Sequence, residues 1–184
     1  MRPIDPTGAT WSAAEVPVGS RSRHPIALLG ALVIVVLGSC GDGTDTPEFA
    51  ATTWPDERPV EVTELGGSPV LLAGWATWCV PCERELPALD EFAESPASDG
   101  IEIVAVNVDR SDVSDDDLAR MLDRLDVDLQ VWRDTDQTFL AAYDGAMMPY
   151  SVLLDRDGGV AASWTGSLNP EGDDFLAAVA GVTG

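Results

Sequence analysis

The sequence contains no lysine and only one histidine. Its 10 basic residues are all arginine, and 32 acidic residues outnumber them. The resulting net charge of −22 repels the phosphate backbone of nucleic acids, so we expect no nucleic-acid partner. His24, the single histidine, lies in an N-terminal segment that we expect to be removed from the mature chain. Catalysis by a nucleophile that histidine activates, as in Ser-His or Cys-His sites, is therefore excluded for the mature chain.

Cysteine is scarce as well, with three residues in the chain: Cys40, Cys79 and Cys82. A zinc site needs about four nitrogen or sulfur ligands, and only Cys40 and His24 could join the other two, so we predict no metal. A c-type haem attachment requires histidine directly after the second cysteine, where Glu83 stands. A purely structural disulfide gains most from closing a long loop, whereas Cys79 and Cys82 enclose only two residues. We predict no cofactor.

Residues 26–37 form an unbroken apolar run that is short for a membrane-spanning helix, which needs about 20 residues. The run follows Arg21 and Arg23, which is typical of the hydrophobic region of a signal peptide. The next residues, Leu37-Gly38-Ser39-Cys40, resemble a bacterial lipobox, which implies a lipid-modified Cys40 at the mature N-terminus. At least two acyl chains would then anchor the chain stably to the outer face of the cell membrane. An uncleaved anchor with an idle Cys40 thiol is the alternative.

Two thiols stand in the segment Trp75-Ala76-Thr77-Trp78-Cys79-Val80-Pro81-Cys82, after an apolar run and before a helical pattern. A Cys-x-x-Cys pair at the start of a helix can close a disulfide within one turn, and the unpaired N–H groups there favour a thiolate. Such thiols have pKa values of about 3.5 to 7.5 instead of about 8.5. We predict that Cys79, the more exposed of the two, is the nucleophile and that Cys82 resolves the mixed disulfide.

The Trp-x-x-Trp-Cys-x-Pro-Cys pattern, with Trp78 and Pro81, resembles the active-site signature of the thioredoxin superfamily. It is similar to the membrane-tethered TlpA/ResA branch of thiol:disulfide oxidoreductases. The resemblance covers about residues 50–182 and implies a thioredoxin-like α/β fold, with a mixed central sheet flanked by helices. It also implies a redox-active Cys79–Cys82 disulfide, with Trp78 and Pro81 at the substrate-binding surface.

Glu85 is the candidate acid/base for Cys82. Thioredoxins place a buried aspartate six positions before the first cysteine, but Ala73 stands there in this chain. TlpA/ResA-type proteins instead have a glutamate three positions after the second cysteine, and Glu85 matches it, followed by Leu86-Pro87. Because Cys82 and Glu85 are three residues apart, they share one face of the predicted helix. A solvated Glu85 without a role is the alternative, since most glutamates lie on the surface.

Met148 and Pro149 are the second candidate for substrate binding. Thioredoxin-like proteins hold a cis-proline opposite the cysteine pair, before a strand that leads into a hairpin, and Pro149 matches this position. The resemblance therefore implies a cis Met148–Pro149 bond that lets Met148 meet an incoming peptide. An ordinary trans-proline at the start of a strand is the alternative. Met148 replaces the more frequent threonine or valine, so the resemblance does not define the partner.

The remaining pattern predicts strands alternating with helices, which is typical of an α/β sandwich. We expect three parts: an N-terminal extension and lipoprotein-type signal peptide over residues 1–40, a flexible tether over 41–59, and a thioredoxin-like domain over 60–184. The predicted strands are residues 60–65, 70–75, 101–108, 129–132, 150–154 and 160–164, and the predicted helices are residues 81–95, 114–125, 135–143 and 170–182.

These features predict an extracytoplasmic thiol:disulfide oxidoreductase that reduces protein disulfides. The resemblance implies a role in cytochrome c maturation, in which the Cys-x-x-Cys of an apocytochrome c is reduced before haem attaches and a membrane thiol carrier donates the electrons. The spacing of the cysteines does not separate this reductase from an oxidase or isomerase of secreted proteins. A redox-inactive binding or adaptor module is the alternative from another class. A peroxide-reducing role is less favoured, because the Thr-x-x-Cys arrangement is absent.

Overall fold

A computed structural model describes residues 49–65 and 67–184 of the chain. The predicted signal peptide, Cys40 and residues 41–48 of the predicted tether lie outside the described residues. Among the residues that are described, no helix has the length and apolar character needed to cross a membrane.

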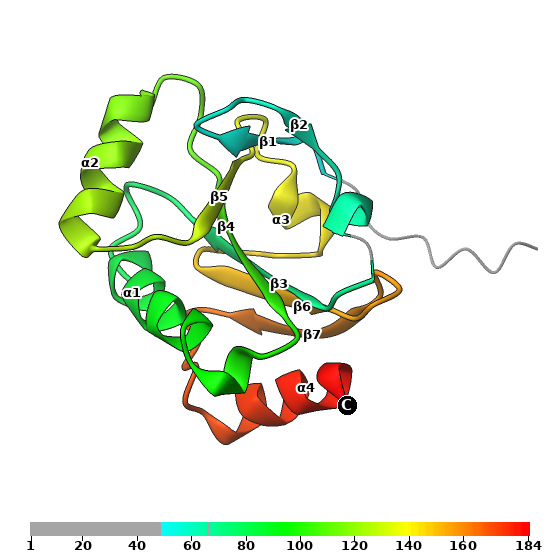
Figure 1. Cartoon of the computed structure of the whole chain (residues 1–184). Helices are drawn as coiled ribbons and strands as arrows, with labels where there is room; N and C mark the ends of the chain where they lie inside the picture. The colour runs from blue at the N-terminus through cyan, green and yellow to red at the C-terminus, as the bar shows by residue number, and fades with distance from the viewer. Residues whose placement is uncertain (1–48, 66) are drawn as a thin grey trace, which may run out of the picture. The chain divides into compact units, whose positions relative to one another are not determined.

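The described chain folds around one seven-stranded sheet with the strand order β2-β1-β5-β4-β3-β6-β7 (Figure 1). The strands are β1 (Ala51–Trp54), β2 (Pro59–Val60), β3 (Val70–Trp75), β4 (Glu102–Asn107), β5 (Gln130–Arg133), β6 (Tyr150–Leu154) and β7 (Val160–Thr165). The helices are α1 (Cys82–Ala93), α2 (Asp115–Leu125), α3 (Phe139–Ala142) and α4 (Asp173–Thr183), and two short 3-10 helices span Val62–Leu65 and Pro96–Ser98. Strands β3, β4 and β5 run parallel, whereas β6 is antiparallel to β3, so the predicted mixed α/β sheet is confirmed.

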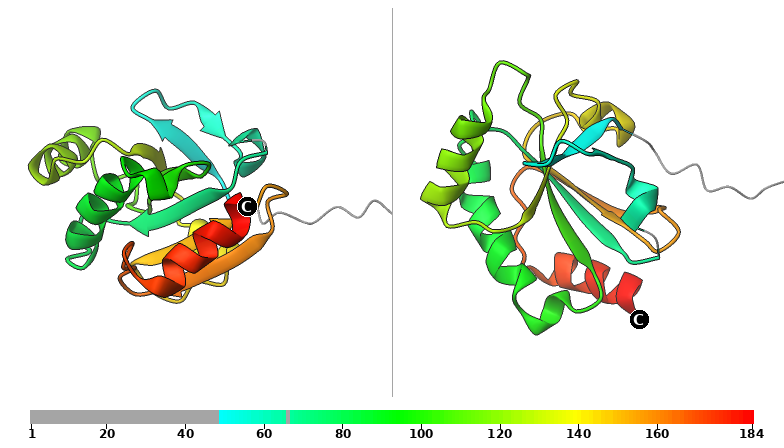
Figure 2. Two further views of the ribbon diagram at one scale, coloured as in Figure 1. Left: turned by 60° about the horizontal axis from the view of Figure 1, so that its bottom comes forward. Right: turned by 45° about the horizontal axis from the view of Figure 1, so that its top comes forward.

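Strand β3 lies inside the sheet, between β4 and β6, and all six of its residues are apolar or small and buried. Its side chains pack alternately in two buried hydrophobic clusters. Leu71 and Ala73 pack in the cluster that includes Phe92 of α1 and Phe175 of α4, whereas Leu72 packs in the larger cluster that includes residues of α2 and α3. Figure 2 shows α4 lying across β6 and β7, the strands that its residues contact. Helices therefore cover the part of the sheet around β3, the strand that leads into the cysteine motif.

The predicted tether is wrong for residues 49–59. Strand β1 pairs with β5, where Thr53 lies opposite Trp132, and also with β2. Phe49 is buried, and its ring lies 5.3 Å from the ring of Phe139 and 6.1 Å from that of Tyr143. The polar composition of residues 41–59 concealed the few apolar side chains that bring this segment into the fold. The folded part therefore includes Phe49 and does not begin at Val60.

The other elements differ from the prediction mainly at their ends. Val60 and Val62 of the predicted strand 60–65 are buried, but a two-residue strand and a 3-10 helix bury them instead of one strand. Helix α3 is shorter than predicted because Asp134 accepts hydrogen bonds from the backbone of Thr138 and Phe139 and so fixes its start. Helix α4 begins after Gly172 instead of at residue 170, and Asn169 Oδ1 accepts a hydrogen bond from the N–H of Glu171 in the turn before the helix.

Candidate active site

The two cysteines of the motif lie between the end of β3 and the first turn of α1. Their sulfur atoms are 1.99 Å apart, which is a disulfide bond, and their Cα atoms are 5.3 Å apart. Backbone hydrogen bonds of 3.0 Å join Cys79 N to Ala76 O and Cys82 N to Cys79 O, so tight turns carry the chain from strand to helix. Cys79 is only slightly more exposed than Cys82, at 3% against 1%. The predicted difference in exposure is therefore small in the disulfide form.

Apolar side chains surround this buried disulfide at the surface. Trp78 is 62% exposed and Val80 is 66% exposed, although both flank Cys79 in the sequence. Met147, in the loop before β6, is 58% exposed. Exposed apolar side chains that lie together are typical of a binding surface. The sequence analysis singled out Trp78 but missed Val80 and Met147, whose exposure depends on how two distant loops meet the sheet.

Pro149 precedes β6, and the Met148–Pro149 peptide bond is cis, as the resemblance implied. The first residue of β6, Tyr150, pairs with Gly74, so this loop lies beside the end of β3. A Cβ atom on Gly74 would lie 2.6 Å from the ring of Phe139 and 3.0 Å from the methyl group of Met148, so only glycine fits. The Met148 side chain therefore packs inward against β3, and its predicted contact with a substrate remains a prediction.

Glu85 is buried in the first turn of α1, with only 4% of its surface exposed. Ser151 Oγ donates a hydrogen bond of 3.2 Å to Glu85 Oε1, and the backbone N–H of Leu168 donates one of 3.0 Å to Oε2. Burial raises the pKa of Glu85 from its ordinary value of 4.5 to about 7, although both hydrogen bonds act to lower it. A solvated Glu85, the alternative considered above, is therefore wrong.

The carboxyl group of Glu85 lies beside the strand position where thioredoxins carry their aspartate. Ala73 of β3 is paired in register with Ser151 of β6, and Ser151 is the residue that contacts Glu85. Side chains of such a cross-strand pair are about 5 Å apart at Cβ. The small side chain of Ala73 thus leaves the polar contacts of this position to Ser151 and Glu85.

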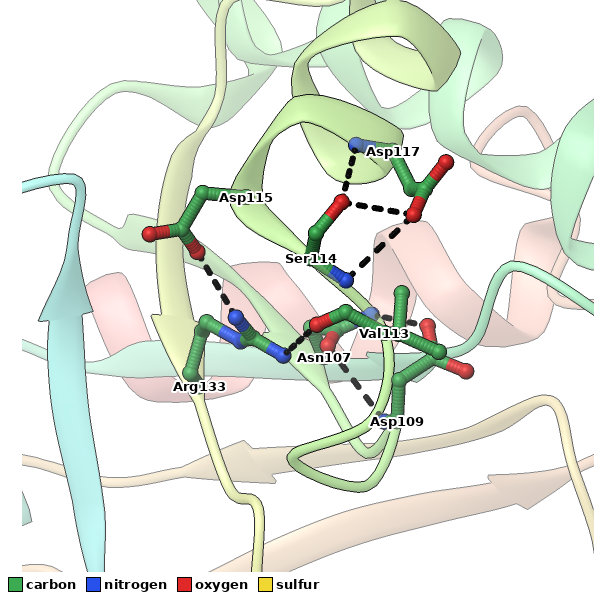
Figure 3. Close-up of polar contacts among 7 residues, drawn as sticks. All are labelled: Asn107, Asp109, Val113, Ser114, Asp115, Asp117 and Arg133. Carbon is green, nitrogen blue, oxygen red and sulfur yellow. Dashed lines mark hydrogen bonds and ion pairs between the residues drawn. The ribbon is translucent and has the colours of Figure 1, made fainter.

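A second buried carboxylate, Asp109, fixes the loop that carries the motif. Asp109 is 1% exposed and accepts hydrogen bonds of 2.8 Å from Thr77 N and 3.1 Å from Thr77 Oγ1. It also accepts one of 2.8 Å from Asn107 Nδ2 at the end of β4 (Figure 3). Asp109 therefore ties the residue two positions before Cys79 to the neighbouring strand. The sequence analysis missed this contact, because residues 77 and 109 are far apart in the chain.

Residues 49–65 and 67–184 contain no group of three or more His, Cys, Asp or Glu side chains that could hold a metal ion. Glu83, which follows the second cysteine, forms a 3.1 Å ion pair with Arg124 of α2 near the surface. The reactive side chains that the described structure brings together here are the two cysteines and the buried Glu85.

Comparison with known proteins places the chain in a family. The model of the AhpC/TSA family matches residues 43–167. The thiol-disulfide oxidoreductase ResA of Bacillus subtilis (strain 168) is 34% identical over 130 residues, which is 71% of this chain and 70% of the relative. A Chlorobium tepidum protein described as a thiol:disulfide interchange protein DsbE has a similar crystal structure, with a TM-score of 0.65 and 26% identity over 76% of this chain and 95% of that one.

A secreted disulfide oxidoreductase of Mycobacterium tuberculosis shares the fold, with a TM-score of 0.58 and 22% identity over 75% of this chain and 98% of that one. The predicted thioredoxin-like fold and the predicted relationship to ResA-type thiol:disulfide oxidoreductases are thereby confirmed. Because the family match spans more than half of the sequence, this chain belongs to the AhpC/TSA family.

Proposed function

We propose that this thiol:disulfide oxidoreductase works outside the cytoplasm and reduces disulfides of protein partners. The observation that carries the proposal is the Cys79–Cys82 disulfide at the start of α1, one turn away from a buried carboxyl group with a pKa of about 7. The names of the curated relatives support the reaction class. The signal-peptide pattern of residues 26–37 supports the location.

The reaction begins with the reduced protein. The Cys79 thiolate attacks one sulfur of the partner disulfide, an S–S bond forms between them, and the second partner sulfur leaves as a thiolate. Cys82, after giving its proton to Glu85, attacks Cys79 Sγ and forms the Cys79–Cys82 disulfide, and the first partner sulfur leaves. Two electrons pass to the partner, and its two thiolates take up protons from Glu85 and from water.

Glu85 suits the second step because a buried thiol ionises reluctantly without a base. A group with a pKa near the working pH can both accept a proton and return it. With its pKa raised to about 7, Glu85 meets this condition at neutral pH, whereas a solvated glutamate would be ionised almost completely. The carboxylate that thioredoxins place on β3 is not needed at Ala73.

The exposed apolar surface next to the disulfide is the proposed site for the partner. Trp78, together with Pro81, Met148 and Pro149, is the predicted substrate-binding set, and Val80 adds a further exposed apolar side chain. An aromatic side chain that is mostly exposed supplies a large contact area when a partner covers it. This arrangement favours a protein or peptide disulfide over a small polar substrate.

The proposed partner is an apocytochrome c whose Cys-x-x-Cys must be reduced before haem attachment, the context that the ResA-type resemblance implies. A membrane thiol carrier supplies two electrons and so returns Cys79 and Cys82 to the dithiol state. Lipid modification of Cys40 would hold the enzyme beside that donor. The protein itself needs no bound cofactor for this exchange, because both electrons are stored in the cysteine pair.

A single-turnover assay with a Cys-x-x-Cys peptide disulfide tests the proposal. Cys79→Ser removes the nucleophile, so reduction of the peptide should fall to the background rate. Cys82→Ala should instead accumulate a mixed disulfide between Cys79 and its partner, which non-reducing electrophoresis detects. Cys40→Ser is the matched control, because it removes the third thiol and should leave peptide reduction unchanged. Peptide reduction by Cys79→Ser at the wild-type rate would contradict the assignment.

Equilibration of the cysteine pair with glutathione tests the direction of electron flow. Homologous folds span about −120 mV for strong oxidants to about −270 mV for reductants. We expect a value near the reducing end, because the proposed partner is a disulfide that must be opened. A potential near −120 mV would support an oxidase of secreted proteins instead.

A further inference from the structure

Ser151 is a fully buried polar residue that the proposed reaction does not use. It is the second residue of β6, with Ala73 of β3 on one side and Trp164 of β7 on the other. Its hydroxyl group donates a 3.2 Å hydrogen bond to Glu85 Oε1, although the two residues are 66 positions apart in the sequence. A buried hydroxyl costs free energy unless it is paired, so this contact accounts for its place in the sheet.

The two hydrogen-bond partners of Glu85 differ in what they can do. The backbone N–H of Leu168 can only donate, and it contacts Oε2 at 3.0 Å. The hydroxyl group of Ser151 can donate or accept, and it contacts Oε1. An ionised carboxylate needs donors, whereas a protonated carboxyl group also needs an acceptor for its O–H. Of these two partners, only Ser151 can satisfy both states.

The other titratable groups on the elements around Glu85 are few. Cys79 and Cys82 lie at the start of α1, and Tyr150 of β6 donates its hydroxyl proton to Tyr143 O at 2.7 Å. Residues 70–75 of β3 and residues 166–170 before α4 include no titratable side chain.

Two charged side chains of the neighbouring helices contact other residues. Glu83 of α1 pairs with Arg124 of α2, and Asp174 of α4 accepts a hydrogen bond from Trp164 Nε1. The hydrogen-bond partners of the Glu85 carboxyl group are a neutral hydroxyl and a backbone amide, and neither of them is a cation.

We propose that Ser151 is a positioning residue for Glu85: its hydroxyl donates to the ionised carboxylate and accepts from the protonated acid, so that both states of the acid/base are hydrogen-bonded in the buried site. This proposal rests on the proposed role of Glu85 in the reaction. As Glu85 takes the proton of Cys82, the Ser151 hydroxyl rotates and the Leu168 amide keeps the carboxyl group in place. Ser151 itself neither gains nor loses a proton.

Titration of Glu85 in the full-length oxidised protein tests this link, with the side-chain carboxyl carbon followed by NMR. Glu85→Gln identifies the signal by removing it. Ser151→Ala should raise the midpoint by about one pH unit, because a hydrogen bond to a charged acceptor is about twice as strong as one to a neutral group. Ser163→Ala is the matched control, since Ser163 is exposed on the adjacent strand and should leave the midpoint unchanged.

Ser151→Thr and Ser151→Val form a second pair of nearly equal shape that differs in the hydroxyl group. Both β-branched residues suit a strand, and the threonine variant should titrate like the wild type while the valine variant follows alanine. Equal midpoints in the two variants, or an unchanged midpoint in Ser151→Ala, would overturn the proposal. The oxidised protein has no free thiol at this site, so a shifted midpoint supports the Ser151 link even if a separate peptide assay shows no reductase activity. That result would overturn only the proposed function.

Discussion

The molecule contains two serine–carboxyl pairs in which the pKa of the carboxyl group is shifted in opposite directions. At the start of α2, Ser114 Oγ lies 2.6 Å from Asp117 Oδ2 (Figure 3), and this hydrogen bond is the main reason why the pKa of Asp117 is lowered. In the site, Ser151 makes the equivalent contact with Glu85, but burial raises the pKa of Glu85 to about 7. The same hydrogen bond is present in both pairs, so access to water decides the sign of the shift.

The two pairs also differ in their purpose. Ser114 and Asp117 form a reciprocal capping box, in which Asp117 N donates to Ser114 Oγ and Ser114 N donates to Asp117 Oδ2. Such a box satisfies backbone N–H groups that would otherwise lack a partner at the helix end. Glu85 accepts a hydrogen bond from one backbone N–H, that of Leu168, which does not belong to a helix. One pair therefore caps a helix, whereas the other holds the buried carboxyl group that is the proposed acid/base.

The largest expected effect is on the pH dependence of stability, and it comes from Glu85→Gln. A folded-state pKa above the unfolded value means that Glu85 favours the folded state fully below about pH 4.5, and this contribution is lost as the pH rises through about 7. The loss corresponds to about 3 kcal/mol. Denaturant unfolding of oxidised protein should therefore show Glu85→Gln to be more stable than wild type at pH 8, with a much smaller difference at pH 4.

Asp117→Asn supplies the contrast to Glu85→Gln. Because the pKa of Asp117 is lowered in the folded state, its contribution to stability is present above the unfolded value and is lost as the pH falls through the folded value. The difference in free energy of unfolding between wild type and Asp117→Asn should therefore shrink in acid. The corresponding difference between wild type and Glu85→Gln is already small at that pH. Parallel pH profiles for the two variants would show that burial does not separate the pairs.

Sequence alone predicts the parts of this comparison that depend on nearby residues. The capping box can be recognised in the sequence because Ser114 and Asp117 are three positions apart, and helix α2 begins where it was predicted. The hairpin of β6 and β7 follows in the same way from the turn residues at 155–159. The cysteine pair and Glu85 were found from their spacing together with a family resemblance, since spacing by itself left a solvated Glu85 open.

Contacts that depend on the order of the strands in the sheet cannot be recognised from a local pattern in the sequence. Ser151 meets Glu85 only because β6 pairs with β3, and Leu168 meets it only because the chain returns past β7. Asp109 meets Thr77 because β4 is parallel to β3, so that both strands end at the same edge. The burial of Phe49 was hidden for a related reason, since a polar average over residues 41–59 says nothing about one aromatic ring. Long-range packing therefore determined what the sequence did not predict.

A smaller effect is expected from Ser114→Ala, which removes the cap of α2 without touching the site. Loss of a serine N-cap should lower Tm by about 3 °C in a chain of this size. The peptide-reduction rate should stay at the wild-type value, because the hydrogen bonds of Ser114 join it to Asp117 at the start of α2 and not to the cysteines or Glu85. Calorimetry and the single-turnover assay measure the two effects separately. A large fall in rate at unchanged Tm would join the two pairs functionally and so break the comparison.

The smallest effect should follow from Arg120→Ala. Arg120 is exposed and donates to Asp117 Oδ1, and its charge is the last of the four causes of the Asp117 pKa shift. Exposed ion pairs contribute little and are screened by salt, so the change in Tm should be smaller than that of Ser114→Ala and should vanish at 1 M salt. The Ser114 hydrogen bond would persist at high salt. If Arg120→Ala instead matched Ser114→Ala at low salt and lost its effect at 1 M salt, the Arg120 charge rather than the serine hydroxyl would hold Asp117 ionised, and the exposed pair would no longer be a counterpart of Ser151 and Glu85.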